Sequence, residues 1–216
     1  MQVNEPGHTA ASTEEERATL AAPLRKRPKP GERRVQILQA LATMLEQPGA
    51  ERVTTAALAA RLGVSEAALY RHFASKAQMF EGLIDFIEQS VFTLVNQIAE
   101  RELSAHEKAG QVVRVLIQFA EKNPGMTRVM VGDALVFENE RLQQRMNLFF
   151  DKLESALKQV LREGAAAEGS AAPTVDAQAR AAMHTALVMG QLQRFARSGF
   201  RRLPSEHLDA TLELLR

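Results

Sequence analysis

A short stretch of the sequence, Ser65–Lys76, concentrates side chains that can bind a phosphate or touch a base. It contains the only tyrosine of the chain, Tyr70, followed directly by Arg71 and His72 and ending with Lys76. A tyrosine ring can cover a sugar or a thymine methyl group while its hydroxyl donates to a phosphate. Arginine, histidine and lysine suit the nucleic-acid backbone. The stretch therefore indicates contact with nucleic acid.

Small side chains lie just before the tyrosine. Ala67 and Ala68 are too short to hydrogen-bond a base, but they can pack on thymine methyl groups and let a helix approach DNA closely. Thr54 and Thr55 lie upstream. If a helix begins there, its N-terminal amides and hydroxyls can bind phosphate.

Two short helices must position these groups. Apolar residues recur at helical spacing on both sides of Gly63, which suits a tight turn because it tolerates a positive φ. Thr54 or Thr55 can cap the first helix, and Ser65 the second. Such a helix-turn-helix places the N-terminal residues of its second helix in the major groove, whereas in an ordinary helical hairpin Tyr70 would simply pack. The candidate DNA-binding residues are Arg33, Arg34, Thr54, Thr55, Ser65, Glu66, Ala67, Ala68, Tyr70, Arg71, His72 and Lys76.

The chain before this motif is rich in proline and charge. Residues 1–30 are poor in large apolar side chains and contain four prolines, which predicts disorder. Six basic residues lie between Arg25 and Arg34, against the single acid Glu32. Such a block is a solvated tail in most proteins, but directly before a DNA-reading motif it predicts a phosphate-binding arm.

Helical periodicity continues from Gly31 onward, and no alternating β-branched run is found, so the sequence predicts an all-α fold. Ser75 is expected to cap a long helix, and GAAAEGSAAPT, Gly164–Thr174, is predicted to be a flexible linker. Further helices are expected at about 104–122, at 126–131, from 133 or 138 to 162 and at 175–198, with a short one after 204. The predicted domains are a basic extension at 1–30, a DNA-binding head at 31–76, and a dimerisation and partner-binding domain at 77–216.

The composition argues against several classes of function. The chain has no cysteine, so it lacks a disulfide framework and a thiolate site, which fits a reducing cytoplasm. We find no apolar run near the ~18 residues of a membrane span and no secretory leader. The five histidines are far apart, and no phosphate-binding loop or nucleophile arrangement is found, so we expect no metal, no cofactor and no enzymatic activity. His184 is expected in a core or an interface.

The motif as a whole resembles a known family of regulators. The residues Thr54-Thr55, Leu62-Gly63-Val64-Ser65 and Leu69-Tyr70-Arg71-His72-Phe73, followed by Ser75-Lys76, resemble the TetR family of dimeric bacterial DNA-binding proteins. The segments KNPGMTRVMVGDALVFENERLQQRMNLFF and LRE extend the likeness, from Gly31 to about Arg202, to members that act in nucleoid occlusion. The resemblance implies a helix-turn-helix head, an all-helical body and a homodimer formed by two C-terminal helices.

The same resemblance implies a function and a place in the cell. Nucleoid occlusion members bind palindromic sites over most of the chromosome, in the cytoplasm and on the nucleoid. When bound to DNA they antagonise polymers of the tubulin-like division GTPase FtsZ, so that septa do not close over the chromosome. The alternative is a repressor whose helical body encloses a small molecule that prises the two heads apart.

A partner-binding groove is expected between the fourth and fifth helices. Phe86 falls off the main apolar stripe of its helix and needs another neighbour, either the fifth or sixth helix or a partner peptide. By resemblance, the residues that would bind the C-terminal tail of FtsZ are Phe86, Val115, Gln118, Lys122 and Asn123. Lys122 would attract an acidic peptide. Asn123 is alternatively a plain helix cap.

A dimer interface is expected on the last long helix. Ala182, Ala186 and Gly190 recur at four-residue spacing, which lets helices approach closely. With Phe149 and Leu153 of the preceding long helix, they favour a four-helix bundle made from two chains. The alternative is packing within one subunit.

Overall fold

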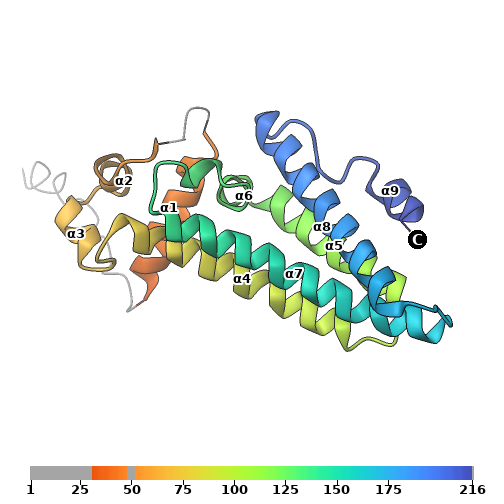
Figure 1. Cartoon of the computed structure of the whole chain (residues 1–216). Coiled ribbons are helices and arrows are strands. Elements are labelled where there is room, and N and C mark those ends of the chain that lie inside the picture. The colour runs from red at the N-terminus through yellow and green to blue at the C-terminus, as the bar shows by residue number, and fades with distance from the viewer. Residues whose placement is uncertain (1–30, 48–51, 216) are drawn as a thin grey trace, which may run out of the picture.

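The computed structural model describes residues 31–47 and 52–215, and the described elements are all helices (Figure 1). The all-α prediction is therefore confirmed. The predicted extension at 1–30 lies outside the described residues. The elements are α1 (Glu32–Leu45), α2 (Thr55–Leu62), α3 (Glu66–Tyr70), α4 (Lys76–Ala99), α5 (Ala105–Lys122), α6 (Pro124–Met130), the 3-10 helix η3 (Asp133–Leu135), α7 (Glu140–Ala167), α8 (Pro173–Arg197) and α9 (Leu208–Leu214).

Helices α1, α2 and α3 form a small head at one end of the molecule (Figure 1). The Thr54 hydroxyl caps α2 by accepting from the amide of Ala57, and the Ser65 hydroxyl caps α3 by accepting from the amide of Ala68. Gly63 ends α2 with φ of 63°, the left-handed conformation that the turn requires. The helix-turn-helix predicted from the sequence is thus present.

Four long helices, α4, α5, α7 and α8, build the body, and α4 and α7 lie side by side along its length (Figure 1). Ion pairs link α7 to α4: Arg141 contacts Glu81 at 2.7 Å, and Arg145 contacts both Asp85 and Glu88. These pairs fix the lateral position of α7 against the helix that leaves the head.

Helix α6 joins the body to the head. The helix starts with Pro124 at its first position, where the missing proline N–H costs nothing. At Gly125 a Cβ would lie 1.9 Å from the carbonyl oxygen of Ala42 in α1, so a side chain there is impossible without displacing the backbone. This close approach holds the head against the body.

The linker predicted for Gly164–Thr174 is shorter in the structure. Helix α7 continues through Ala167 and α8 begins at Pro173, so the connection is only residues 168–172. Alanine has the highest helix propensity, so three consecutive alanines after Gly164 extend the helix. Helix α7 begins at Glu140, near the later of the two predicted starts, because residues 133–135 form the separate 3-10 helix η3. The bounds of α5 and α8 agree with the prediction to within about two residues.

Candidate nucleic-acid interface

Helix α3 has one side buried in the head and a short exposed face. Leu69 and Phe73 are each 1% exposed, whereas Tyr70 is 44% exposed. Glu66, Ala67 and Arg71 are also exposed, and Ala68 and His72 are half-buried. The helix therefore points a tyrosine, a small residue and charged side chains away from the core, as a DNA-reading helix requires.

A side-chain bond fixes α3 relative to the start of α2. The Thr55 hydroxyl donates to the Glu66 carboxylate at 2.5 Å. Glu66 is the first residue of α3, where a negative charge favours the helix N-terminus. Thr54 uses its hydroxyl as a cap and stays exposed. Thr55 and Glu66 therefore link α2 to α3, while Thr54 caps α2.

The basic residues at the start of α1 differ in their surroundings. Arg34 donates to the backbone carbonyl of His72, and its guanidinium lies 4.1 Å from the centre of the Phe73 ring. Arg34 thus ties α1 to the end of the reading helix. Arg33 donates to Gln36 within its own helix.

Lys76, the first residue of α4, is paired. Its ammonium lies 2.5 Å from the carboxylate of Glu138, in the turn before α7. Its Nζ also lies 5.7 Å from the centre of the Phe80 ring. The head and the body meet at this contact.

The α4–α5 surface, defined here by Phe86, Val115, Gln118, Phe119 and Lys122, combines apolar and polar groups. Phe86 is 48% exposed, and its ring lies 6.4 Å from that of Phe119 in α5. Gln118 and Lys122 are exposed, and Val115 is half-buried. Phe86 therefore has the neighbour on α5 that the sequence required, and it still offers half of its surface.

Asn123 has a structural task beside this surface. It ends α5, and its side-chain amide donates to the backbone carbonyl of Phe119 at 2.8 Å. Its own carbonyl accepts from the Thr127 amide and hydroxyl in α6. The alternative interpretation of Asn123 as a helix cap agrees with these contacts.

The outer face of α8 is the second large exposed surface. Ala182, Ala186 and Gly190 are exposed, and so are the neighbouring Met183 (53%) and Met189 (47%). A cavity of 310 Å³ opens beside them between α6, α7 and α8. Its lining is Met130, Val131, Gln143, Asn147, Phe150, Met189, Gly190 and Gln193.

Two of the predicted interface residues do not lie on this surface. Phe149 and Leu153 are both 0% exposed within the single subunit. The Phe149 ring packs edge-on against Phe92 at 5.4 Å and Phe150 at 5.1 Å. Their side of α7 faces α4 and the subunit core, which favours the alternative of packing within one subunit for Phe149 and Leu153.

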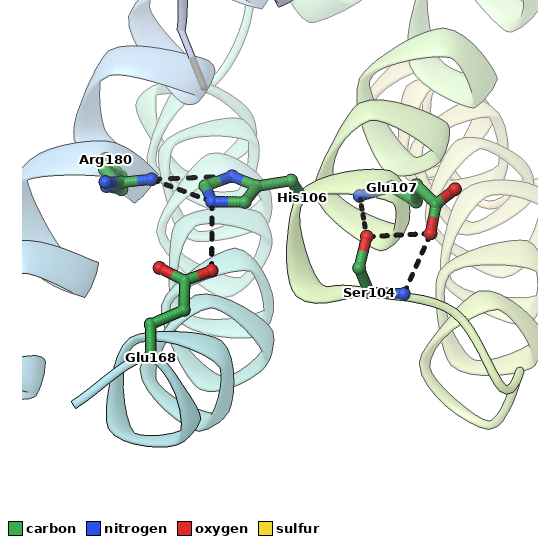
Figure 2. Close-up of polar contacts among 5 residues, drawn as sticks. All are labelled: Ser104, His106, Glu107, Glu168 and Arg180. Carbon is green, nitrogen blue, oxygen red and sulfur yellow. Dashed lines mark hydrogen bonds and ion pairs between the residues drawn. The ribbon is translucent and has the colours of Figure 1, made fainter. Parts of the chain in front are cut away.

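A polar cluster lies at the end of the body far from the head. Figure 2 shows the His106 ring in contact with both Arg180 and Glu168. The Arg180–His106 distance is 3.0 Å and the His106–Glu168 distance is 3.5 Å. Beside it, Ser104 and Glu107 form a reciprocal cap at the start of α5. The His106 ring therefore links the start of α5 to α8 and to Glu168 at the end of α7, while the cap stabilises the first turn of α5.

His184 is a core histidine, one of the two places expected for it. It is 4% exposed, and its Nδ1 lies 2.7 Å from the Arg180 carbonyl. Burial lowers the pKa of His184, and electrostatic repulsion from His106 and Arg180 acts in the same direction. The hydrogen bond to the Arg180 carbonyl acts in the opposite direction. A cavity of 270 Å³ lies beside it, bounded by α5, α8 and the C-terminal segment.

Within the described ranges, no cluster of three or more metal-ligating side chains is found. In the same part of the chain, no helix is long and apolar enough to cross a membrane.

Two family models match the sequence. Residues 37–83 match the bacterial regulatory proteins of the TetR family, and residues 105–216 match the SlmA-like, tetracyclin repressor-like C-terminal domain. The nucleoid occlusion factor SlmA of Photobacterium profundum is 51% identical over 184 residues, which cover 85% of this chain and 93% of that protein. SlmA of Vibrio cholerae serotype O1 gives the same identity and coverage.

The chain belongs to the SlmA branch of the TetR family.

Solved structures agree on the fold. FadR from Bacillus subtilis in complex with stearoyl-CoA superposes with a TM-score of 0.67 over 84% of this chain and 96% of that chain, at 17% identity. At that identity the likeness concerns the fold alone. The family is one of DNA-binding regulators, in keeping with the helix-turn-helix found here.

Sequence reasoning missed two features of these surfaces. Leu94 lies at helical spacing from the buried Val91 and Ile98 of α4 but is 44% exposed. Val136 and Phe137, in the turn before α7, are 69% and 66% exposed. The sequence signal for this exposed pair is that two large apolar residues stand next to each other beside a turn.

Proposed function

We propose that this protein is a nucleoid occlusion factor: as a dimer it binds palindromic chromosomal DNA, and in that state it inhibits FtsZ assembly over the nucleoid. The observation that carries the proposal is the 51% identity to proteins named nucleoid occlusion factor SlmA, which spans the body as well as the head. A likeness confined to the head would support only DNA binding, because many unrelated regulators share that module.

We assign the contact with DNA to the exposed face of α3. Tyr70 and Arg71 are placed to meet sugar and phosphate, while Ala67 leaves room for base edges. Arg34, at the start of α1, lies beside the end of α3, and it extends the positive surface together with the preceding Arg33. His72, two residues after α3, is half-buried.

Dimerisation falls to the exposed face of α8. Ala182, Ala186 and Gly190 form a flat strip flanked by the exposed Met183 and Met189. Exposed methionines beside a cavity provide adaptable apolar contact for a second copy of the same helix. A two-fold axis here sets the two reading helices about 34 Å apart, one DNA turn, which demands a palindromic site.

Binding of the FtsZ C-terminal tail falls to the α4–α5 surface. Phe86 and Val115 offer apolar anchors, Lys122 attracts acidic side chains, and Gln118 supplies a polar rim. Asn123 shapes this surface through its bond to Phe119. Because the head and this surface are separate, DNA and FtsZ can bind one dimer together, and many dimers on DNA gain avidity for a polymer with many tails.

The proposed location follows from the proposed partners: the cytoplasm, on the nucleoid. No step of the function requires a cofactor or a catalytic residue.

A polymerisation assay tests the function. FtsZ with GTP is assembled in the presence of the protein and a duplex carrying the palindrome that the protein selects from random DNA, and polymer is measured by sedimentation. We expect less polymer with that duplex than with a scrambled duplex of equal length. Equal polymer in both samples, with tight DNA binding verified, would overturn the proposal.

A second candidate function is a repressor controlled by a small molecule. The 270 Å³ cavity beside His184, lined also by His106, Gln111 and Arg114, favours it. Its signature would be a metabolite extract that lowers the affinity for DNA in wild type but not in a His184→Gln variant.

A further inference from the structure

We propose that Glu138 restrains DNA binding by occupying Lys76, so that a DNA phosphate must compete with this carboxylate. The inference rests on the proposed function only in that the head binds DNA. It assigns to Glu138, a residue of the body, a role in setting the affinity of the head.

The position of Lys76 qualifies it as a phosphate ligand. It is the first residue of α4, capped by Ser75, and follows the reading helix by a few residues. The amide groups at this helix start and the ammonium both attract an anion. In the structure the anion beside this ammonium is the Glu138 carboxylate, 2.5 Å from Nζ.

The position of Glu138 makes the pair more than an incidental surface contact. The two residues are 62 positions apart, and the Glu138 side chain is only 9% exposed, against 26% for Lys76. Glu138 belongs to the turn between η3 and α7, and its amide donates to the carbonyl of Leu135. The backbone thus holds the carboxylate at the junction of head and body.

The competition has an electrostatic consequence. A lysine that neutralises a phosphate releases a counterion, whereas a lysine held with a carboxylate adds no net positive charge at the DNA surface. Removing the Glu138 charge therefore adds about one effective phosphate contact per subunit. The change should appear on any duplex, because phosphate contacts carry no sequence information.

The turn offers a matched control. Glu140, two residues away and the first residue of α7, is an exposed acid whose carboxylate accepts from Gln144. Glu140→Gln removes the same charge from nearly the same place without touching Lys76. It separates the specific pair from a general gain in positive charge.

The experiment measures duplex affinity against salt by fluorescence anisotropy. The variants are Glu138→Gln, Glu140→Gln, Lys76→Gln and the double variant with Lys76→Gln and Glu138→Gln. The two probes are the palindromic duplex selected by wild type and a random-sequence duplex. Thermal unfolding of each variant checks that the fold is intact.

We expect Glu138→Gln to bind both duplexes roughly two- to fivefold more tightly at low salt, the fold-change of one partly exposed ion pair. For each subunit bound, the slope of log affinity against log salt concentration should be more negative for Glu138→Gln than for wild type by about 0.9. Glu140→Gln should stay within about twofold of wild type with an unchanged slope. In the Lys76→Gln background, Glu138→Gln should change nothing.

Unchanged or weaker binding by Glu138→Gln, while wild type binds normally, would overturn this inference and leave the proposed function standing. An equal gain in Glu140→Gln, or a gain that persists without Lys76, would also overturn it. Failure of wild type to bind either duplex at any salt concentration would instead refute the proposed function.

Discussion

Replacement of Phe149 by alanine tests whether the inner face of α7 is subunit core. The side chain is 0% exposed and makes edge contacts with Phe92 at 5.4 Å and Phe150 at 5.1 Å. Truncating a buried phenylalanine costs about 3–5 kcal/mol, because transfer energy is lost and a cavity remains. Aromatic pairs add about 0.5–1.5 kcal/mol each. Because Phe149→Ala loses two such pairs, we expect the free energy of unfolding to fall by an amount in the upper half of the range of about 3–5 kcal/mol.

The assay is urea unfolding followed by circular dichroism at one fixed subunit concentration. Leu148→Ala is the matched control, since Leu148 is the adjacent residue and is 55% exposed. It should change the free energy of unfolding by less than about 1 kcal/mol. For Phe149→Ala the midpoint should fall while the slope against urea stays the same.

The opposite pattern would refute the assignment. If Phe149→Ala lost less than about 1 kcal/mol of subunit stability but raised the dimer dissociation constant, the ring would belong to the interface that the sequence suggested. Sedimentation equilibrium of both variants distinguishes these cases.

Three further changes probe other parts of the molecule. Tyr70→Ala should weaken binding to the selected palindrome roughly tenfold or more with unchanged thermal stability, measured by anisotropy; unchanged affinity would remove Tyr70 from the interface. Because burial lowers the pKa of His184, the unfolded state takes up a proton more readily, so stability is complete above the ordinary value of 6.5 and falls as pH drops below it. In His184→Gln this part of the pH dependence of unfolding should vanish, and a profile parallel to wild type would contradict it. Ala186→Arg should raise the dimer dissociation constant at least ~10-fold because two like charges would meet at the axis, whereas Ala99→Arg, on an exposed end of α4, should not.

Local signals in the sequence predicted the head well. Thr54 and Ser65 are residues whose hydroxyls cap helices, and Gly63 accepts the left-handed conformation, so each boundary follows from one side chain. The exposed position of Tyr70 follows from the spacing of Leu69 and Phe73, which are both buried.

Contacts between distant segments could not be read in the same way. Periodicity shows that Phe149 and Leu153 share an apolar stripe, but it does not tell whether that stripe meets the same chain or a second one. The Lys76–Glu138 pair joins residues 62 positions apart, and no local pattern specifies it. The end of α7 was misplaced because GAAAEGSAAPT is both linker-like in composition and rich in alanine, the best helix former.

The most direct test of the proposed function is the binding of a labelled FtsZ C-terminal peptide to the protein on its selected palindrome. The variants compared with wild type are Phe86→Ala, on the α4–α5 surface, and Phe137→Ala, an equally large exposed ring elsewhere. We predict that the peptide binds wild type and Phe137→Ala, and that Phe86→Ala loses binding while keeping its affinity for DNA. Peptide binding by Phe86→Ala equal to wild type, or no peptide binding by DNA-bound wild type, would contradict the proposal.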